Sequence, residues 1–153
     1  MRDQFEGDQV VLENALPFLL HNVFQRIRGV TYQAFNQLGL EITPEQWIVL
    51  ARLWQRDART VSELSESTLR DRPTMSRILD GMEAHGFLTR TVDPKDARSR
   101  IVELTREGRA MRKKLVPVAK TIVARLEAGI PEADLLTTRR TLRRMLENLT
   151  TPA

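Results

Sequence analysis

The apolar residues of this chain recur mainly with the period of an α-helix. In the first segment they are spaced by three or four residues, at Leu16, Leu20, Val23, Ile27 and Val30. This spacing places them on one face of a helix, so we predict a long helix over residues 11–38. Gly39 suits the carboxyl end of that helix, and Pro17 marks either its true start or a kink.

Three shorter helices are predicted next. Thr43 can cap a helix whose first position is Pro44, and Gln46 completes the capping box. A third helix starts at Thr60, and a fourth starts at residues 71–73. The fourth helix has an apolar stripe that predicts its buried face, formed by Met75, Ile78, Leu79 and Met82.

The pattern then changes from helix to strand. Residues 87–92 and 99–104 are β-prone, and residues 93–96 between them have turn chemistry. These two strands and their polar tip predict a β-hairpin. A long helix capped by Thr105 and a last helix over residues 132–149 follow it.

This order predicts a mainly α fold with a small β-hairpin wing. The third and fourth helices form a helix-turn-helix, and with the wing they make a lobe over residues 40–104. Residues 1–39 and 105–153 form long helices with more apolar surface than so small a lobe can cover. We expect them to be a helical homodimerisation region. The alternative is a monomer with a long helical core.

The outward residues of the fourth helix have side chains that suit DNA. Thr74, Ser76 and Arg77 lie between its apolar positions. The second helix of such a unit enters the major groove, where hydroxyls reach base edges or phosphates and an arginine can address guanine. The hairpin adds four basic residues on a short ribbon, which suits phosphates and the minor groove: Arg90, Lys95, Arg98 and Arg100.

The charge distribution favours a polyanionic partner. The formal net charge of the 153 residues is +4. Residues 1–50 hold 3 basic and 6 acidic side chains, whereas residues 101–153 hold 11 basic and 6 acidic ones. The positive charge is therefore segregated toward the later part of the chain.

Composition excludes several other classes of protein. The chain has no cysteine and only two histidines, so it cannot build a disulfide scaffold, a zinc–thiolate site or a histidine-rich metal centre. No phosphate-binding loop or metal-binding catalytic motif is present, and we predict no enzyme activity, no cofactor and no metal. No apolar run is long enough to cross a membrane and no signal peptide precedes the first helix, so we expect a cytoplasmic protein.

Several short motifs follow one another along the chain: Val61–Ser65, Pro73–Glu83, Gly86–Arg90 and, most specific, Asp93–Ser99 leading into Val102–Gly108. In this order and spacing they resemble the MarR family of bacterial winged helix-turn-helix transcriptional regulators. The resemblance is strongest over residues 60–108, and the long flanking helices extend it over nearly the whole chain. Ser65 departs from the pattern, because the family usually has alanine there.

The resemblance implies a homodimer that binds double-stranded DNA at a pseudo-palindromic operator. Thr74, Ser76 and Arg77 would face bases in the major groove. Arg98 would reach the minor groove from the wing, with Asp96 orienting it. Contacts to phosphates are implied for a further set of polar and basic residues: Thr60, Ser62, Arg72, Arg90, Lys95 and Arg100.

The resemblance also implies a repressor that is released by a small, often anionic aromatic effector. Side-chain type and location give five candidates for its pocket: His21, Arg28, Tyr32, Trp47 and Trp54. Core packing explains the two tryptophans as well, and His21 can equally be a solvated histidine. The lack of cysteine excludes the cysteine–peroxide sensing of some relatives. Two alternatives stay open: a winged-helix module for protein or RNA, and a DNA-binding regulator without an effector.

Overall fold

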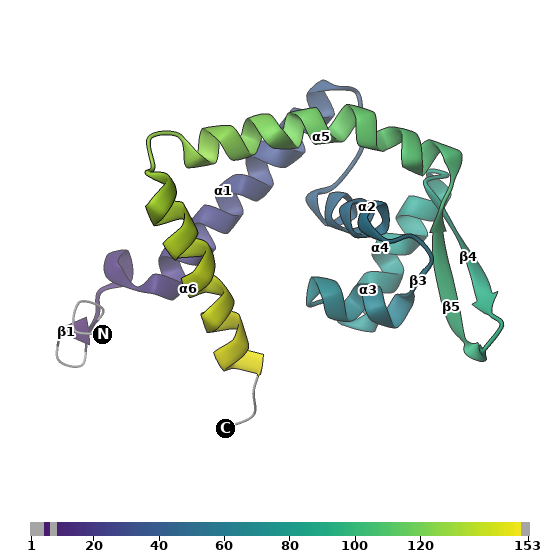
Figure 1. The fold of residues 1–153 in the computed structure, drawn as a ribbon, viewed down its shortest axis with the longest axis horizontal. Coiled ribbons are helices and arrows are strands. Elements are labelled where there is room, and N and C mark those ends of the chain that lie inside the picture. Colours follow the sequence, from purple (N-terminus) through teal and green to yellow (C-terminus); the bar gives the residue numbers. More distant parts are fainter. Residues whose placement is uncertain (1–4, 7–8, 151–153) are drawn as a thin grey trace. The chain divides into compact units, whose positions relative to one another are not determined.

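The computed structural model describes residues 5–6 and 9–150 and divides the chain into two compact units, one ending at Ala119 and one starting at Lys120. The first unit opens with a short antiparallel pair, β1 (Phe5–Glu6) and β2 (Gln9–Val10), and a 3-10 turn, η2 (Leu12–Asn14). Helix α1 (Leu16–Gln37) follows (Figure 1). It starts later than the predicted residue 11. Pro17 lies in its first turn, so this proline marks the start of the helix and not a kink.

The three predicted short helices are present, and their caps are those that the sequence indicates. They are α2 (Pro44–Gln55), α3 (Val61–Thr68) and α4 (Arg72–Ala84). Thr43 and Thr60 each form a complete capping box, and the Asp71 side chain accepts a hydrogen bond from the Thr74 backbone N–H. Each cap satisfies backbone donors that the first turn of a helix would otherwise leave free.

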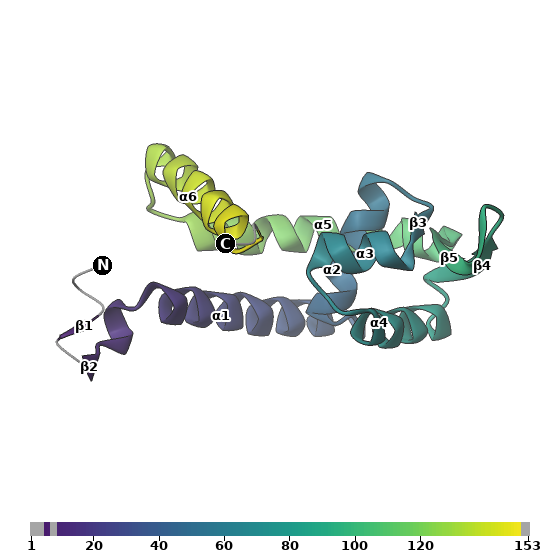
Figure 2. The same ribbon diagram turned by 90° about the horizontal axis from the view of Figure 1, so that it is seen from below.

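The wing is a hairpin of β4 (Leu88–Asp93) and β5 (Asp96–Leu104), and it belongs to a sheet that the sequence pattern only partly predicts. A two-residue strand, β3 (Arg59–Thr60), pairs with β5 and gives the antiparallel order β3-β5-β4. In the register Leu88 faces Leu104, and Arg59 faces Val102. Strand β3 was not predicted, because two polar residues show no alternation. The hairpin projects beside the three helices (Figure 2).

The hydrophobic core of the first unit joins all of these elements. Phe35 of α1, Leu50 of α2, Leu64 of α3, Leu79 of α4 and Val102 of β5 are each fully buried. Burial of side chains of this size is the main source of stability for such a lobe. The core therefore fixes the two helices of the helix-turn-helix and the wing relative to one another.

Helix α5 (Arg106–Glu127) is anchored to the lobe through its first turns. The Thr105 hydroxyl donates to the Gly86 carbonyl at 2.6 Å, and the Trp54 indole N–H donates to the Gly108 carbonyl at 3.0 Å. A Cβ atom at Gly108 would lie 2.0 Å from the Phe87 carbonyl oxygen, so only glycine allows this close approach. The base of the hairpin and the start of α5 thus form one packed joint.

The second unit contains the end of α5 and helix α6 (Glu132–Thr150). Gly129, with φ of +76°, makes the turn between them. Among the described residues of α6 none is buried, although it carries an apolar stripe: Leu135, Leu142, Met145, Leu146 and Leu149. In α1 an apolar group is likewise exposed: Leu19, Leu20, Val23 and Phe24. In α6 Leu135, Leu142 and Met145 are half-buried, whereas Leu146 and Leu149 are exposed.

Candidate functional site

Helix α4 buries one face and presents the opposite face to solvent. Met75, Leu79 and Met82 are buried, as the stripe predicts. Thr74 and Ser76 are half-buried and Arg77 is exposed. Arg77 makes no hydrogen bond or ion pair with any residue that the structure describes. Its guanidinium therefore keeps all of its donors available to a ligand.

The start of α4 is held by Asp71. Its Oδ1 accepts from the Thr74 backbone N–H at 2.7 Å, and its Oδ2 accepts from the Thr74 hydroxyl at 2.9 Å. Hydrogen bonds from the Thr74 backbone and side chain lower the pKa of the Asp71 carboxyl below its usual value. The Thr74 hydroxyl thus gives its proton to the cap and keeps its oxygen lone pairs for an incoming donor.

The tip of the wing carries basic side chains without acidic partners. The Asp96 Oδ1 accepts from the Arg98 backbone N–H at 2.9 Å, and the exposed Arg98 side chain has no recorded partner among the described residues. From the sequence we expected Asp96 to orient Arg98. The carboxylate fixes the backbone at Arg98. The Arg100 guanidinium donates only to carbonyl oxygens, those of Ala97 at 3.2 Å and Ser99 at 3.1 Å.

The base of the wing is arranged differently. The Arg90 guanidinium on β4 donates to Glu83 Oε2 at 2.5 and 3.0 Å and to Asp80 Oδ1 at 2.7 Å. The Arg90 backbone N–H also donates to Glu83 Oε1 at 3.1 Å. The hydrogen bond to Glu83 is the largest cause of a raised pKa at Arg90. Sequence analysis took Arg90 as a phosphate neighbour, but its charge is already matched by two carboxylates of α4.

The remaining predicted phosphate contacts lie at the starts of the two helices and at the hairpin turn. The Thr60 Oγ1 accepts from the Glu63 backbone N–H at 3.1 Å, and Ser62 is half-buried in the next turn. Arg72 and Lys95 are exposed, and neither side chain has a recorded partner in the described part of the chain. The structure therefore places these residues on helix starts or the wing turn, with their polar groups near the surface.

Ser65, the departure from the family pattern, is buried on α3. Its hydroxyl oxygen has no hydrogen-bond partner among the described residues. An unpaired buried hydroxyl costs about 1–3 kcal/mol, whereas the methyl group of alanine has no such requirement. The departure therefore affects the packing of α3 without altering the fold.

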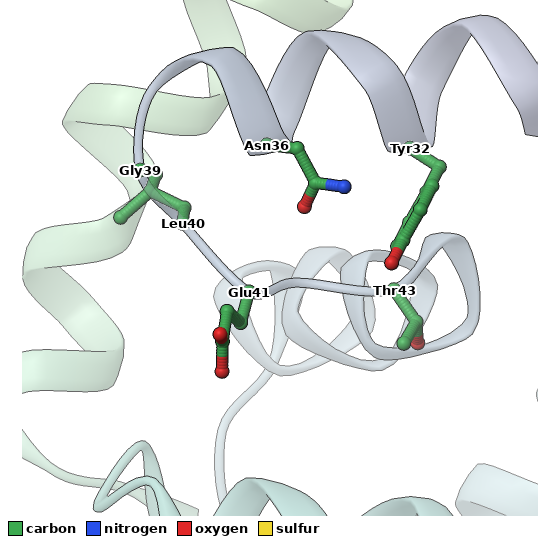
Figure 3. A pocket seen from close by; sticks show the side chains of 6 residues that line it. All are labelled: Tyr32, Asn36, Gly39, Leu40, Glu41 and Thr43. Atoms are coloured by element: carbon green, nitrogen blue, oxygen red, sulfur yellow. The ribbon is translucent and has the colours of Figure 1, made fainter.

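Two adjoining pockets lie where α1 meets the start of α2. One, of about 480 Å³, is lined by residues of α1 and the following segment: Tyr32, Asn36, Gly39, Leu40, Glu41 and Thr43. Figure 3 shows Tyr32 and Asn36 projecting from α1 toward that segment. The other, of about 390 Å³, shares Tyr32 and Thr43 and adds Gln25, Arg28, Gly29, Pro44 and Glu45.

The five predicted pocket residues separate into three groups. Tyr32 and Arg28 line the pockets, and the Arg28 Nε–H donates to Glu45 Oε1 at 2.9 Å. Trp47 and Trp54 instead pack against the core, with ring centroids 5.6 Å apart. His21 is exposed on α1 and lies in neither pocket lining. Glu45 was not among the candidates, and no local pattern could have identified it, because its partner lies 17 residues earlier.

The described residues contain no group of three or more His, Cys, Asp or Glu placed to hold a metal ion. Among the described helices, none combines the length and apolar character needed to cross a membrane.

Comparisons with known proteins identify the family. The sequence profile of the MarR family matches residues 42–99. The organic hydroperoxide resistance transcriptional regulator of Bacillus subtilis is 34% identical over 117 residues, which cover 76% of this chain and 78% of that protein.

Solved structures agree with this result. A MarR-family regulator from Silicibacter pomeroyi is 28% identical with a TM-score of 0.79, covering 97% of this chain and 99% of that one. Bordetella bronchiseptica BpsR, whose DNA binding is regulated by 6-hydroxynicotinic acid, is 26% identical with a TM-score of 0.81, covering 91% and 97%. The chain belongs to the MarR family of DNA-binding transcriptional regulators, with a winged helix-turn-helix lobe.

Proposed function

We propose that this regulator is a homodimeric repressor that binds a pseudo-palindromic operator through α4 and the wing, and that a small anionic aromatic ligand releases it. The observation that carries the proposal is the exposure and pairing of two arginines. Arg77 on α4 and Arg98 at the wing tip are exposed, and neither guanidinium makes a hydrogen bond or salt bridge with a described residue, although the charge of Arg77 acts on the Asp71 carboxylate. Both are available for the charge-assisted contacts that DNA offers.

The roles follow from position and chemistry. Arg77 addresses a base edge in the major groove, with Thr74 and Ser76 beside it, and Arg98 enters the minor groove. The phosphate contacts come from side chains near helix starts and the wing: Thr60, Ser62, Arg72, Lys95 and Arg100. Asp96 holds the backbone that carries Arg98. Arg90 stabilises the wing, because its guanidinium is paired with Glu83 and Asp80.

The dimer is supported by apolar surface that the units do not bury. Val23 and Phe24 of α1 are 49% and 51% exposed, and Leu149 of α6 is 87% exposed. Exposed apolar groups at helical spacing favour association with a second copy. We assign residues 1–39 and 105–153 to this dimerisation region and residues 40–104 to the DNA-binding lobe. A two-fold dimer in turn requires operator half-sites about one helical turn apart, roughly 10 base pairs.

The effector is supported by the pockets beside α1 and α2. Tyr32 supplies an aromatic ring, and Arg28 supplies a cation that an anionic ligand would share with, or take from, the Glu45 carboxylate; these groups suit a small aromatic carboxylate. BpsR, similar in fold and sequence, responds to a compound of that class. The chain has no cysteine, so it lacks the thiol that cysteine–peroxide sensing requires.

The proposal is tested by titrating the purified protein with the DNA upstream of its own gene and with a random duplex, at several salt concentrations. We expect tighter binding to the upstream DNA, at one protein dimer of twice 17.6 kDa per site. Adding 6-hydroxynicotinate and benzoate as probes should weaken that binding. Equal, weak binding to both duplexes would contradict operator recognition. Unchanged binding across a wider set of aromatic acids would favour a regulator without an effector.

A further inference from the structure

One carboxylate lies between two arginines, one on α1 and one in the turn between α3 and α4. The Glu45 Oε1 on the first turn of α2 accepts from the Arg28 Nε–H at 2.9 Å and lies 3.9 Å from the Arg70 terminal nitrogen. The Glu45 side chain is only 18% exposed. Burial acts to raise its pKa, but the arginines and its backbone hydrogen bond outweigh burial and lower it. Glu45 is therefore ionised at neutral pH, and both arginines compete for one oxygen.

One arginine lies at the proposed effector pocket, and the other lies beside the start of α4, the helix proposed to bind DNA. Arg28 lies on α1 and lines the pocket together with Glu45 itself. Arg70 lies in the turn between α3 and α4, directly before Asp71, the residue that caps the recognition helix. The Arg70 backbone N–H donates to the Ser65 carbonyl at 3.0 Å. A change at the Arg70 side chain thus acts on the segment that sets the start of α4.

The backbone of this turn is held in an unfavourable conformation. Leu69 has φ of +53°, a left-handed value that residues with a side chain adopt at a cost. Strained positions persist only while their surroundings hold them in place. The contact at Arg70 is one of the restraints next to Leu69, so its loss or strengthening can shift the turn.

We propose that Glu45 transmits occupancy of the pocket to the recognition helix. A carboxylate ligand that binds the Arg28 guanidinium removes one competitor for Glu45 Oε1, and this oxygen then pairs more closely with Arg70. The turn before Asp71 moves toward α2, and α4 leaves the position in which it binds DNA. This inference rests on the proposed function, because it uses the same pocket and the same DNA-binding helix. Glu45 and Arg70 are positioning residues in this proposal: neither contacts a DNA base or the aromatic ring of the effector.

A double-mutant cycle tests the coupling without an effector. Arg28→Met removes the competing guanidinium and so reproduces what a bound anion does to Glu45. We expect Arg28→Met to weaken operator binding about fivefold in the parent background and to have no effect in the Arg70→Met background. Arg26→Met is the matched control, because Arg26 lies on the same helix, is exposed and has no recorded partner among the described residues.

A second readout uses the protein without DNA. The rate of hydrogen exchange over residues 66–74 should change in Arg28→Met and should not change in Arg26→Met. In the Arg70→Met background, adding Arg28→Met should leave this rate unchanged. Thermal unfolding of each variant separates a loss of stability from a shift of the turn. Additive effects of Arg28→Met and Arg70→Met on both readouts would overturn the proposal, as would identical behaviour of Arg28→Met and Arg26→Met.

The outcomes separate this inference from the function on which it rests. Coupled hydrogen exchange together with equal binding to operator and random DNA would support the Glu45 connection and contradict operator recognition. Tight operator binding with an additive cycle would support the function and overturn the connection. A coupled change that strengthens operator binding would keep the connection and contradict release of a repressor by the ligand.

Discussion

The base and the tip of the wing carry the same basic residue type in opposite electrostatic states. At the base, Arg90 is 22% exposed and donates to both Glu83 and Asp80 of α4. At the tip, Arg98 is exposed, and the nearby Asp96 accepts from its backbone N–H and not from its guanidinium. The hairpin is thus fixed to α4 by one arginine and presents the other to its surroundings.

The difference indicates that a count of the basic residues in a segment does not give the number of guanidinium groups that are available to contact DNA. A guanidinium that already pairs with carboxylates must lose those contacts, or share them, before it can meet a phosphate. A guanidinium without protein partners gives up only its bound water when it contacts a phosphate. We therefore expect the effects of substitution to follow the pairing state of each arginine and not its position on the hairpin.

The largest effect is expected at Arg77, the unpaired arginine on the outward face of α4. If it reads a base edge, Arg77→Ala should cost about 1–3 kcal/mol of discrimination at one position in each half-site. Competition binding with operators changed at single positions measures this. An unchanged preference at every position would show that an unpaired arginine on this face does not read sequence.

Arg98→Ala should weaken binding to operator and random DNA by similar factors, about tenfold at low salt. The loss is uniform because a contact to phosphate or to the minor groove depends weakly on sequence. Titrations of both duplexes check the prediction, and circular dichroism confirms the fold. A loss of affinity for the operator alone would show that Arg98 contributes to sequence recognition and not to general attraction for DNA.

Arg90→Met should act on stability first. The hydrogen bonds of this guanidinium to Glu83 are partly shielded from water, whereas the one to Asp80 is exposed, and the loss of all three should lower the free energy of unfolding by about 1–2 kcal/mol. Urea denaturation measures it, and Glu83→Gln is the matched variant from the other side of the pair. A large loss of DNA affinity in Arg90→Met with unchanged stability would remove the contrast between the base and the tip of the wing.

The smallest effect is expected for Arg100→Ala. The Arg100 guanidinium donates to two carbonyl oxygens on the hairpin, so it keeps its charge but has a restricted direction. We expect a loss of about twofold in the affinity for any duplex. Parallel DNA titrations of Arg98→Ala and Arg100→Ala compare the losses of affinity in the two variants. A loss equal to that of Arg98→Ala would show that carbonyl contacts do not restrict this side chain.

Local signals in the sequence predicted most of the fold. Helix starts are encoded within a few residues: the predicted cap at Thr43 is confirmed, and α3 begins at Val61, directly after Thr60, where a helix start was predicted. The wing was predicted from its β-prone runs, but strand β5 starts at Asp96 and not at Ser99, because polar residues of the tip also join the ladder. Strand β3 was missed for the same reason, since pairing with β5 makes it a strand and its own composition does not.

The sequence predicted less of the candidate site, because pairing is a tertiary property. Arg90 and Arg98 look alike in the sequence, and only the folded chain brings Asp80 and Glu83 to Arg90. Glu45 was missed because both of its partners come from other elements. Trp47 and Trp54 were proposed for a pocket on residue type, whereas the structure packs them against the core.

The salt dependence of operator binding tests the contrast within the wing most directly. The slope of log Kd against log salt counts the phosphates that the protein neutralises. We predict that Arg98→Ala reduces this slope by about one unit per protomer and that Arg90→Met leaves it unchanged. Equal reductions in the two variants, or a larger one in Arg90→Met, would show that the paired arginine also meets DNA and would contradict the account.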